Sequence, residues 1–266
     1  MADFDGPRGK RVLAATRLHI GDMSKAPDFT AISAFVSRFG EFVDGVAVAV
    51  GVPGAPEETA LAELQALADN VREAAPAATV IPVTPWGAFT PALNALVDHA
   101  ARNGYDYILF ASVETACTAS TISALQSHLD ADAQVFVAGA ALPGHAFSLG
   151  EAELSGVTCP WNTLALWRVS TLSLVGFPLV AEGLHAGVSG GVEEVSAIEA
   201  VRRVLRPGVA RALLVAVPGV EWETSFDDEK RAVWHASKMA SKTSRPAAQL
   251  KLFGEAQTSR VEHLEH

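Results

Sequence analysis

The first 113 residues alternate between short apolar runs without helical spacing and longer stretches whose apolar residues recur at helical spacing. The apolar runs, expected as buried strands, are 11–15, 45–50, 79–83 and 107–113. The helical stretches are 29–39, 57–74 and 90–103, the last with Thr90 expected as its cap and Pro91 at its first position. Strands joined by single helices require right-handed crossovers. We therefore predict an α/β fold with a mostly parallel sheet flanked by helices and a ligand site at the carboxyl ends of the strands.

The second half of the chain is less regular. It predicts helices at 120–129 and 195–205, the latter stopped by Pro207-Gly208, and strands at 135–140, 163–167 and 212–217. No repeat or linker divides it. We expect a flexible N-terminus at 1–10, a single domain at 11–226 and a basic helical tail at 227–263, with 264–266 as a tag remnant left out of the fold.

Composition excludes several classes of protein. A chain of 266 residues that is 49% hydrophobic can bury a large core, whereas a net charge of −10 argues against a duplex nucleic-acid binder. Cys117 and Cys159 are too few and too far apart for a disulfide framework or a metal knuckle. The first ten residues are polar and lack the apolar core of a signal peptide, and no apolar run reaches about 18 residues. We expect a soluble cytoplasmic protein with reduced thiols.

Several familiar motifs are missing. Ala14-Ala15-Thr16-Arg17 follows the first strand where a dinucleotide site would carry GxGxxG, and there is no Walker loop, GxSxG elbow or HExxH. The histidines are dispersed along the chain. These absences remove dinucleotide, P-loop, serine-hydrolase and zinc-peptidase interpretations.

The stretch from Gly87 to Thr115 is the most informative. Gly87 precedes a helix that contains Asn94, Gly104-Tyr105-Asp106 leads into the fourth strand, and Ser112-Val113-Glu114 follows that strand. The order resembles family 2 inverting glycosyltransferases, in which a glycine, a helix with an Ala-Arg-Asn triplet, a Gly-Asp-Tyr-Ile strand and an Asp-x-Asp motif succeed one another.

The resemblance continues downstream and covers about two thirds of the chain. The segment from Asn162 to Gly176-Phe177 resembles the acceptor-side segment, and 190–194 resembles the Glu-Asp motif that opens a helix. The resemblance implies the GT-A fold and transfer of a sugar from a nucleoside-diphosphate donor to an unknown acceptor hydroxyl or amine.

Donor chemistry explains the acidic motif. The leaving nucleoside diphosphate gains negative charge that a cation or positively charged donors must neutralise. Glu114 falls on the second acidic position and would hold Mn or Mg, but Ser112 replaces the first acid and is a poor ligand for a hard ion. The motif is therefore degenerate, and we expect weak binding of free metal. The alternative for Glu114 is a solvated loop carboxylate or helix cap.

Glu194 falls on the position of the catalytic base, and Glu193 beside it would raise its pKa. Two acids in a first helical turn are also what the helix dipole favours, so a structural role stays open.

Other residues are expected along the same cleft. Trp161, with Asn162, is either a stacking platform for the acceptor or a core residue. The resemblance implies that Asn94 and the acidic-motif residues Ser112, Val113 and Glu114 bind the donor. The fold implies five more donor-binding residues: Thr16, Arg17, Gly51, Trp86 and Gly87. Gly51 begins Gly51-Val52-Pro53, which stands where the family usually has a base-reading aspartate, so the base cannot be inferred.

The stretch 229–251 carries a net charge of +5 and four of the six lysines, interleaved with Trp234. It could fold over the cleft and supply Lys or Arg to the diphosphate, touch an anionic membrane, or form a solvated helix.

We therefore predict a glycosyltransferase with a nucleotide-sugar partner and no nucleic-acid partner. The first alternative is a catalytically degenerate nucleotide- or nucleotide-sugar-binding protein. A nucleotidyltransferase is less favoured, since 14–21 lacks a glycine- and arginine-rich phosphate loop.

Overall fold

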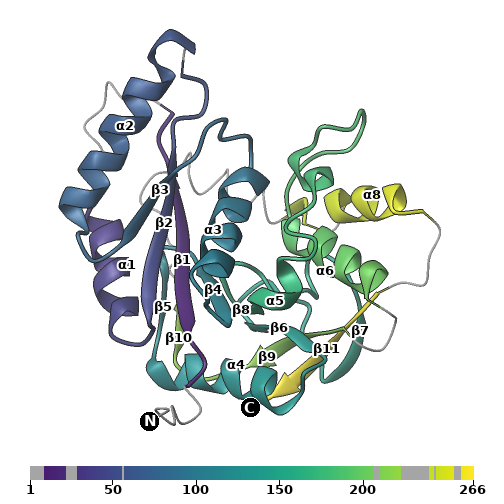
Figure 1. Ribbon diagram of the computed structural model, residues 1–266. Helices are drawn as coiled ribbons and strands as arrows, with labels where there is room; N and C mark the ends of the chain where they lie inside the picture. Colours follow the sequence, from purple (N-terminus) through teal and green to yellow (C-terminus); the bar gives the residue numbers. More distant parts are fainter. Residues whose placement is uncertain are drawn as a thin grey trace, which may run out of the picture.

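The computed structural model describes residues 9–21, 29–55, 57–205, 210–222, 240–242, 244–254 and 259–266. Within them, a nine-stranded sheet runs through the molecule in the order β3-β2-β1-β4-β8-β6-β9-β11-β7 (Figure 1). Its strands are β1 (Val12–His19), β2 (Gly45–Gly51), β3 (Thr79–Pro82), β4 (Tyr107–Ala111), β6 (Val135–Ala140), β7 (Gly150–Glu153), β8 (Leu164–Arg168), β9 (Arg211–Ala216) and β11 (Arg260–Glu265). A small second sheet pairs β5 (Thr115–Cys117) with β10 (Val220–Trp222).

The N-terminal half confirms the predicted parallel unit. β1 pairs in parallel with β2 and β4, and β2 pairs in parallel with β3. Figure 1 shows α1 (Thr30–Gly40) and α2 (Glu57–Ala74) on one side of these strands and α3 (Thr90–Arg102) on the other. Helices on both faces explain why β1, β2 and β4 are almost continuous runs of buried valine, alanine and leucine.

This half of the sheet has a topological switch point. The chain passes from β1 to β2 and β3 along one side of the sheet, then returns by α3 to β4 on the other side of β1. Strand order therefore reverses between β1 and β4. In open α/β sheets this is where ligands bind, beyond the carboxyl ends of the strands.

The second half is mixed in direction. β8 runs antiparallel to both of its neighbours, β4 and β6, whereas β6, β9 and β11 are parallel to one another. The remaining helices are α4 (Ala119–Ala131), α5 (Val169–Leu172), the 3-10 helix η1 (Leu179–Glu182), α6 (Glu193–Val204) and α8 (Ser244–Leu252). The predicted fold class is confirmed: a large, mostly parallel sheet is flanked by helices.

The C-terminal segment enters the sheet, in place of the helix predicted there. After α8, residues 260–265 form β11 between β9 and β7, with Val261 and His263 buried. Strand β11 includes Leu264, and the His266 backbone N–H donates to the Ala216 carbonyl at 3.2 Å. Leu264 and Glu265 are therefore part of β11, and His266 is hydrogen-bonded to β9, although the prediction left 264–266 out of the fold. The origin of these residues as a tag stays a prediction. The segment is too short and polar for its alternation to stand out as a strand.

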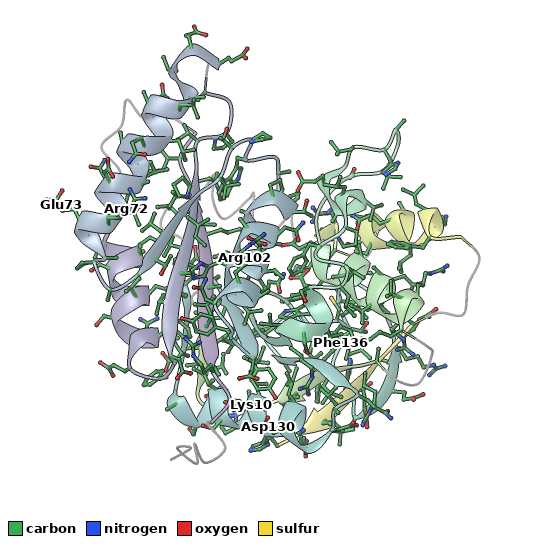
Figure 2. All side chains as sticks on the ribbon, in the orientation of Figure 1. Lys10, Arg72, Glu73, Arg102, Asp130 and Phe136 are labelled. Atoms are coloured by element: carbon green, nitrogen blue, oxygen red, sulfur yellow. The ribbon has the colours of Figure 1, made fainter. Side chains whose placement is uncertain are left out.

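The core is continuous across the sheet, and its largest fully buried side chains include Trp161, Trp167 and Tyr107. In Figure 2, Phe136 lies among the side chains of the interior, whereas Glu73 points outward from α2. Cys117 and Cys159 are both buried thiols. Among the described helices, none combines the length and apolarity needed to cross a membrane. The predicted flexible segment, apart from Gly9 and Lys10, and the Pro207-Gly208 stop lie outside the described residues.

Candidate functional site

A cleft of about 910 Å³ opens at the switch point between β1 and β4. Its walls come from the ends of these strands, the N-terminus of α3, the first turn of α6 and the segment before α8. Eleven of the thirteen predicted site residues line it: Thr16, Arg17, Trp86, Gly87, Ser112, Val113, Glu114, Trp161, Asn162, Glu193 and Glu194. The structure thus brings together residues that lie as much as 178 positions apart in the sequence.

Gly51 does not line the cleft but packs against Trp86, which does. It ends β2 opposite His19 of β1, and the Trp86 ring packs so closely on it that a Cβ atom would overlap the ring. Trp86 and His19 both line the cleft, with ring centroids 5.5 Å apart. Glycine at this position therefore lets Trp86 lie flat against the strand end. Burial, and then the Arg17 charge, lower the pKa of His19.

Asn94 also lies outside the cleft lining. Its side chain accepts a hydrogen bond from the Phe177 N–H at 2.7 Å and donates one to the Phe177 carbonyl at 3.0 Å. The predicted helix residue and the predicted Gly176-Phe177 pair are thus directly linked. In this structure Asn94 fastens α3 to the chain after α5, and its part in donor binding stays a prediction.

The N-terminus of α3 is capped by the last residue of η1, which is distant in the sequence. Thr90 is the first helical residue and not the cap as expected; Phe89 precedes the helix without a side-chain cap bond. Instead, the Glu182 carboxylate accepts backbone N–H groups from Ala88 and Phe89, each at 2.6 Å, and from Thr90. A carboxylate satisfies three unpaired amides and the positive helix end at once, which a threonine hydroxyl cannot do.

Glu193 opens α6 and pairs with Arg17 of β1. The Arg17 Nη2 lies 2.8 Å from the Glu193 Oε1, and its Nη1 donates to the Phe89 carbonyl at 3.1 Å. One guanidinium therefore joins β1, α3 and α6 across the cleft. Glu193 is buried, so the partner offsets part of the cost of removing its carboxylate from water.

Glu194 is the next residue of α6 and is only 6% exposed. Its Oε1 accepts the Asn162 backbone N–H at 2.6 Å. Burial, and then the neighbouring Glu193, raise the pKa of Glu194 to about 7, against the opposing effects of the Asn162 hydrogen bond and the Lys242 charge. A carboxyl group with this pKa can accept a proton near neutral pH and still lose it again, as a general base must.

The residue before this acidic pair is strained. Val192 has φ 56° and ψ 53°, the left-handed region, which a β-branched residue rarely adopts. Such a conformation costs on the order of 1–3 kcal/mol and persists where surrounding structure enforces it, often at functional sites. Here it sets the direction in which α6 begins, and hence where Glu193 and Glu194 enter the cleft.

Trp161 is 2% exposed, and its indole N–H donates to the Gly156 carbonyl at 2.8 Å. The His145 ring stacks on it at 3.6 Å, and the Lys242 Nζ lies 2.8 Å from its ring centroid. Burial agrees with the alternative interpretation of a core tryptophan. Its use as an acceptor platform stays a prediction.

The acidic motif offers few metal ligands. Glu114 is the sole carboxylate of 112–114, and the Ser112 hydroxyl lies 3.1 Å from the Thr115 hydroxyl. Across the described ranges, no cluster of three or more His, Cys, Asp or Glu side chains is placed to hold a metal ion. Hard divalent ions favour several oxygen ligands. Within the described ranges, the donor set around Glu114 therefore does not fit a Mn or Mg ion held by protein ligands alone.

The basic stretch contributes residues that the site prediction did not name. Lys242 and Arg245 line the cleft, and Lys242 is 7% exposed. Lys251, further along α8, is exposed. The tail residues Lys230, Arg231, Trp234 and Lys238 lie outside the described part of the chain.

Comparisons with known proteins bear on the fold. No family model and no curated protein matches the sequence. Among solved structures, the mannosyltransferase PcManGT from Pyrobaculum calidifontis in complex with GDP-Man and Mn2+ is similar with a TM-score of 0.57 and 15% identity, over 95% of this chain and 67% of that one. A 4-diphosphocytidyl-2C-methyl-D-erythritol synthase follows at TM-score 0.46 and 14% identity, over 88% and 99% of the two chains. The S. aureus protein TarS reaches 0.41 at 14% identity, over 70% and 33%. At these identities the likeness shows the fold alone, which is GT-A-like.

Proposed function

We propose that the protein is an inverting glycosyltransferase of the family 2 type that moves a sugar from a nucleoside-diphosphate donor to an acceptor hydroxyl, with Glu194 as the general base. The observation that carries the proposal is the buried Glu194 carboxyl, whose pKa lies at about 7, in the cleft at the switch point of a GT-A-like sheet. The Asn162 N–H and the first turn of α6 favour the charged form of Glu194, but burial and Glu193 outweigh them and keep its pKa raised.

The proposed step is a single displacement. Glu194 accepts the proton of the acceptor hydroxyl while that oxygen forms a bond to the anomeric carbon of the sugar. The bond from that carbon to the β-phosphate oxygen breaks, and its electron pair leaves with the nucleoside diphosphate. The Asn162 N–H fixes one oxygen of the Glu194 carboxyl, which leaves the other oxygen for the acceptor proton.

The donor is proposed to bind at the end of the cleft formed by β1, α3 and β4. Thr16 and Arg17 lie within β1, Trp86 and Gly87 precede α3, and 112–114 follow β4. These positions are where a doubly wound sheet binds a nucleotide. Trp161 and Asn162 lie beside Glu194 and are proposed for the acceptor side.

The second candidate function is binding of the nucleotide sugar without catalysis. Ser112 in place of an acidic residue favours a protein that binds a nucleotide sugar without transferring it. The two candidates differ in whether nucleoside diphosphate is released from the bound donor.

The experiment is a thermal-shift screen of the full chain against UDP, GDP, ADP, CDP and their common sugar conjugates, followed by assay of nucleoside diphosphate release with the best donor. A concentration-dependent rise in Tm with one nucleotide series is expected, because a ligand that binds the folded state stabilises it. Binding together with release supports the enzyme, binding without release in the presence of varied acceptors supports the second candidate, and no shift with any nucleotide overturns both.

A further inference from the structure

Three consecutive carbonyl groups before α6 accept hydrogen bonds from two side chains of α8. The chain just before α6 forms no helix or strand, so its carbonyl groups need partners from elsewhere. The Gln249 amide donates to the Ser189 carbonyl at 3.0 Å and to the Gly191 carbonyl at 2.8 Å. Arg245 donates from its Nη1 to the Gly190 carbonyl at 2.9 Å. α8, drawn in yellow beside the green α6 in Figure 1, thus fixes the backbone that leads into the acidic pair.

Gln249 is a fully buried polar side chain. Its Nε2 makes both bonds to the carbonyl groups, whereas its Oε1 has no hydrogen-bond partner in the part of the chain that the structure describes. Removing an amide oxygen from water without a partner costs free energy. A methionine of nearly the same shape would avoid that cost. What the glutamine contributes at this position is therefore its two bonds to the Ser189 and Gly191 carbonyls.

These two bonds act on the backbone next to the strained residue. Gly191 has φ 105° and Val192 has φ 56°, so two successive residues lie in the left-handed region directly before α6. Glycine adopts this region without strain, but valine does not. A strained conformation persists only where surrounding contacts enforce it. Gln249 supplies such a contact at the carbonyl of the residue that immediately precedes Val192.

We propose that Gln249 is a positioning residue for Glu194. Through its two carbonyl partners it holds Val192 in the left-handed region and so directs the first turn of α6 into the cleft. Gln249 is not among the residues that line the cleft, so it acts on the reaction only through α6. A misplacement of a reacting group by about 1 Å can cost on the order of 10²-fold in rate. The role of Glu194 as a base rests on the proposed function, whereas the placement of its carboxyl by Gln249 does not.

The first test needs no substrate. It is an NMR titration of the glutamate carboxyl carbons in isotopically labelled full-length protein, with the Glu194 resonance assigned by its loss in Glu194→Gln. The wild-type carboxyl should titrate with a pKa of about 7. In Gln249→Met the carboxyl should leave its buried site, so its pKa should fall toward the ordinary value of 4.5, by about one pH unit or more. In the described part of the chain, the charged and titratable groups that face it are Glu193, Cys159 and Lys242, and the variant keeps all three.

The second test is turnover with the best donor. Gln249→Met should lower kcat about 10- to 100-fold and leave donor affinity within about twofold, since a base acts in the transition state and not on the bound donor. Adding Val192→Gly should restore most of the lost kcat, because glycine adopts the left-handed region without being held there. Leu250→Ala is the matched control on α8. Its apolar side chain packs on the core and cannot hydrogen-bond to the segment before α6, so Tm should fall while the titration and kcat stay the same.

An unshifted pKa of Glu194 in folded Gln249→Met overturns the proposal without reference to activity. A fall in kcat that Val192→Gly leaves unrepaired overturns it as well, because Gln249 then does not act through the strained residue. If Gln249→Met does not fold, Gln249→Asn, which is shorter by one methylene, takes its place with the same expectation. Absence of turnover with every donor in wild type is a different result. It removes the proposed function and leaves the titration to decide whether Gln249 positions the Glu194 carboxyl.

Discussion

The backbone N–H of Asn162 lies 2.6 Å from the Glu194 Oε1 and joins the loop before β8 to the first turn of α6. The residue predicted for the acceptor side thus holds the residue predicted as the base. The bond uses a backbone group, so it survives replacement of the Asn162 side chain.

Glu194→Gln is the direct test of the base. A glutamine keeps the acceptor for the Asn162 N–H but cannot take a proton, so turnover should fall by about 10²- to 10⁴-fold while donor affinity stays within about twofold. Steady-state turnover and donor titration measure the two effects separately. Glu199→Gln is the control, because Glu199 is a buried carboxylate of the same helix that pairs with Arg203 away from the cleft lining. Unchanged turnover in Glu194→Gln removes this residue from the mechanism.

The pH dependence of sugar transfer should follow the titration of the Glu194 carboxyl. A base acts in its deprotonated form, and the pKa of Glu194 is about 7, so kcat/KM should rise with pH through about 7 and then level off. The groups that face Glu194 are Glu193, Lys242, Cys159 and the Asn162 N–H. A pH profile that is flat between pH 5.5 and 8.5 argues against Glu194 as the titrating base.

Folding stability should fall as pH rises through 7, whereas kcat/KM should rise. Because the pKa of Glu194 is raised to about 7 from its ordinary value of 4.5, the folded state binds this proton more tightly than the unfolded state. Stability from this group is complete below about pH 4.5 and is lost as pH rises through 7. Glu194→Gln should therefore be more stable than wild type at pH 8, by on the order of 3 kcal/mol, with little difference at pH 4.5. Urea unfolding at the two pH values measures this. A variant that is less stable at pH 8 contradicts it.

Glu182→Gln should destabilise the protein at neutral pH by about 1–2 kcal/mol, because the carboxylate caps three amides of α3. Burial acts to raise the pKa of Glu182, but the N–H groups of Ala88, Thr90 and Phe89 outweigh it and lower the pKa overall. The stabilisation is thus present at neutral pH and lost as pH falls through the lowered pKa, so variant and wild type should converge in acid. Glu73→Gln, on the outward side of α2 in Figure 2, is the control for loss of a surface charge. If Glu182→Gln and Glu73→Gln change the free energy of unfolding equally at pH 7, Glu182 does not stabilise the N-terminus of α3 as a cap.

Ser112→Asp restores the missing acid of the motif. A second carboxylate beside Glu114 adds the kind of oxygen ligand that Mn2+ and Mg2+ prefer. Nucleoside diphosphate affinity, measured by calorimetry, should become stronger in Mn2+ than in chelator for the variant, and the metal and the nucleotide should strengthen each other's binding equally. Identical affinities in both conditions speak against a degenerate metal motif at this strand end.

The periodic parts of the chain were predictable. β2, α2 and β6 match their expected ranges to within one residue, because each is a continuous apolar run or a clean helical stripe. The parallel order around β1 followed from the alternation of strands and helices. The antiparallel direction of β8 could not be read from its apolar residues, which would be the same in either direction.

Glu182 and Lys242 were not predicted as site residues, because their positions depend on contacts between distant parts of the chain. Glu182 caps a helix that begins 92 positions earlier in the sequence, and Lys242 reaches Trp161 from a segment that sequence patterns describe only as basic. No local pattern distinguishes such a glutamate or lysine from a solvated one. Charge enrichment did draw attention to the stretch that carries Lys242, but not to its place in the cleft.

Strand β11 gives the segment around α8 a second attachment to the fold. α8 contacts α6, and the chain after α8 pairs between β9 and β7, so Lys242, just before α8, and Arg245, in its first turn, are followed by a strand fixed in the interior of the sheet. Their local concentration at the cleft is set by these attachments and not by the amount of protein in solution.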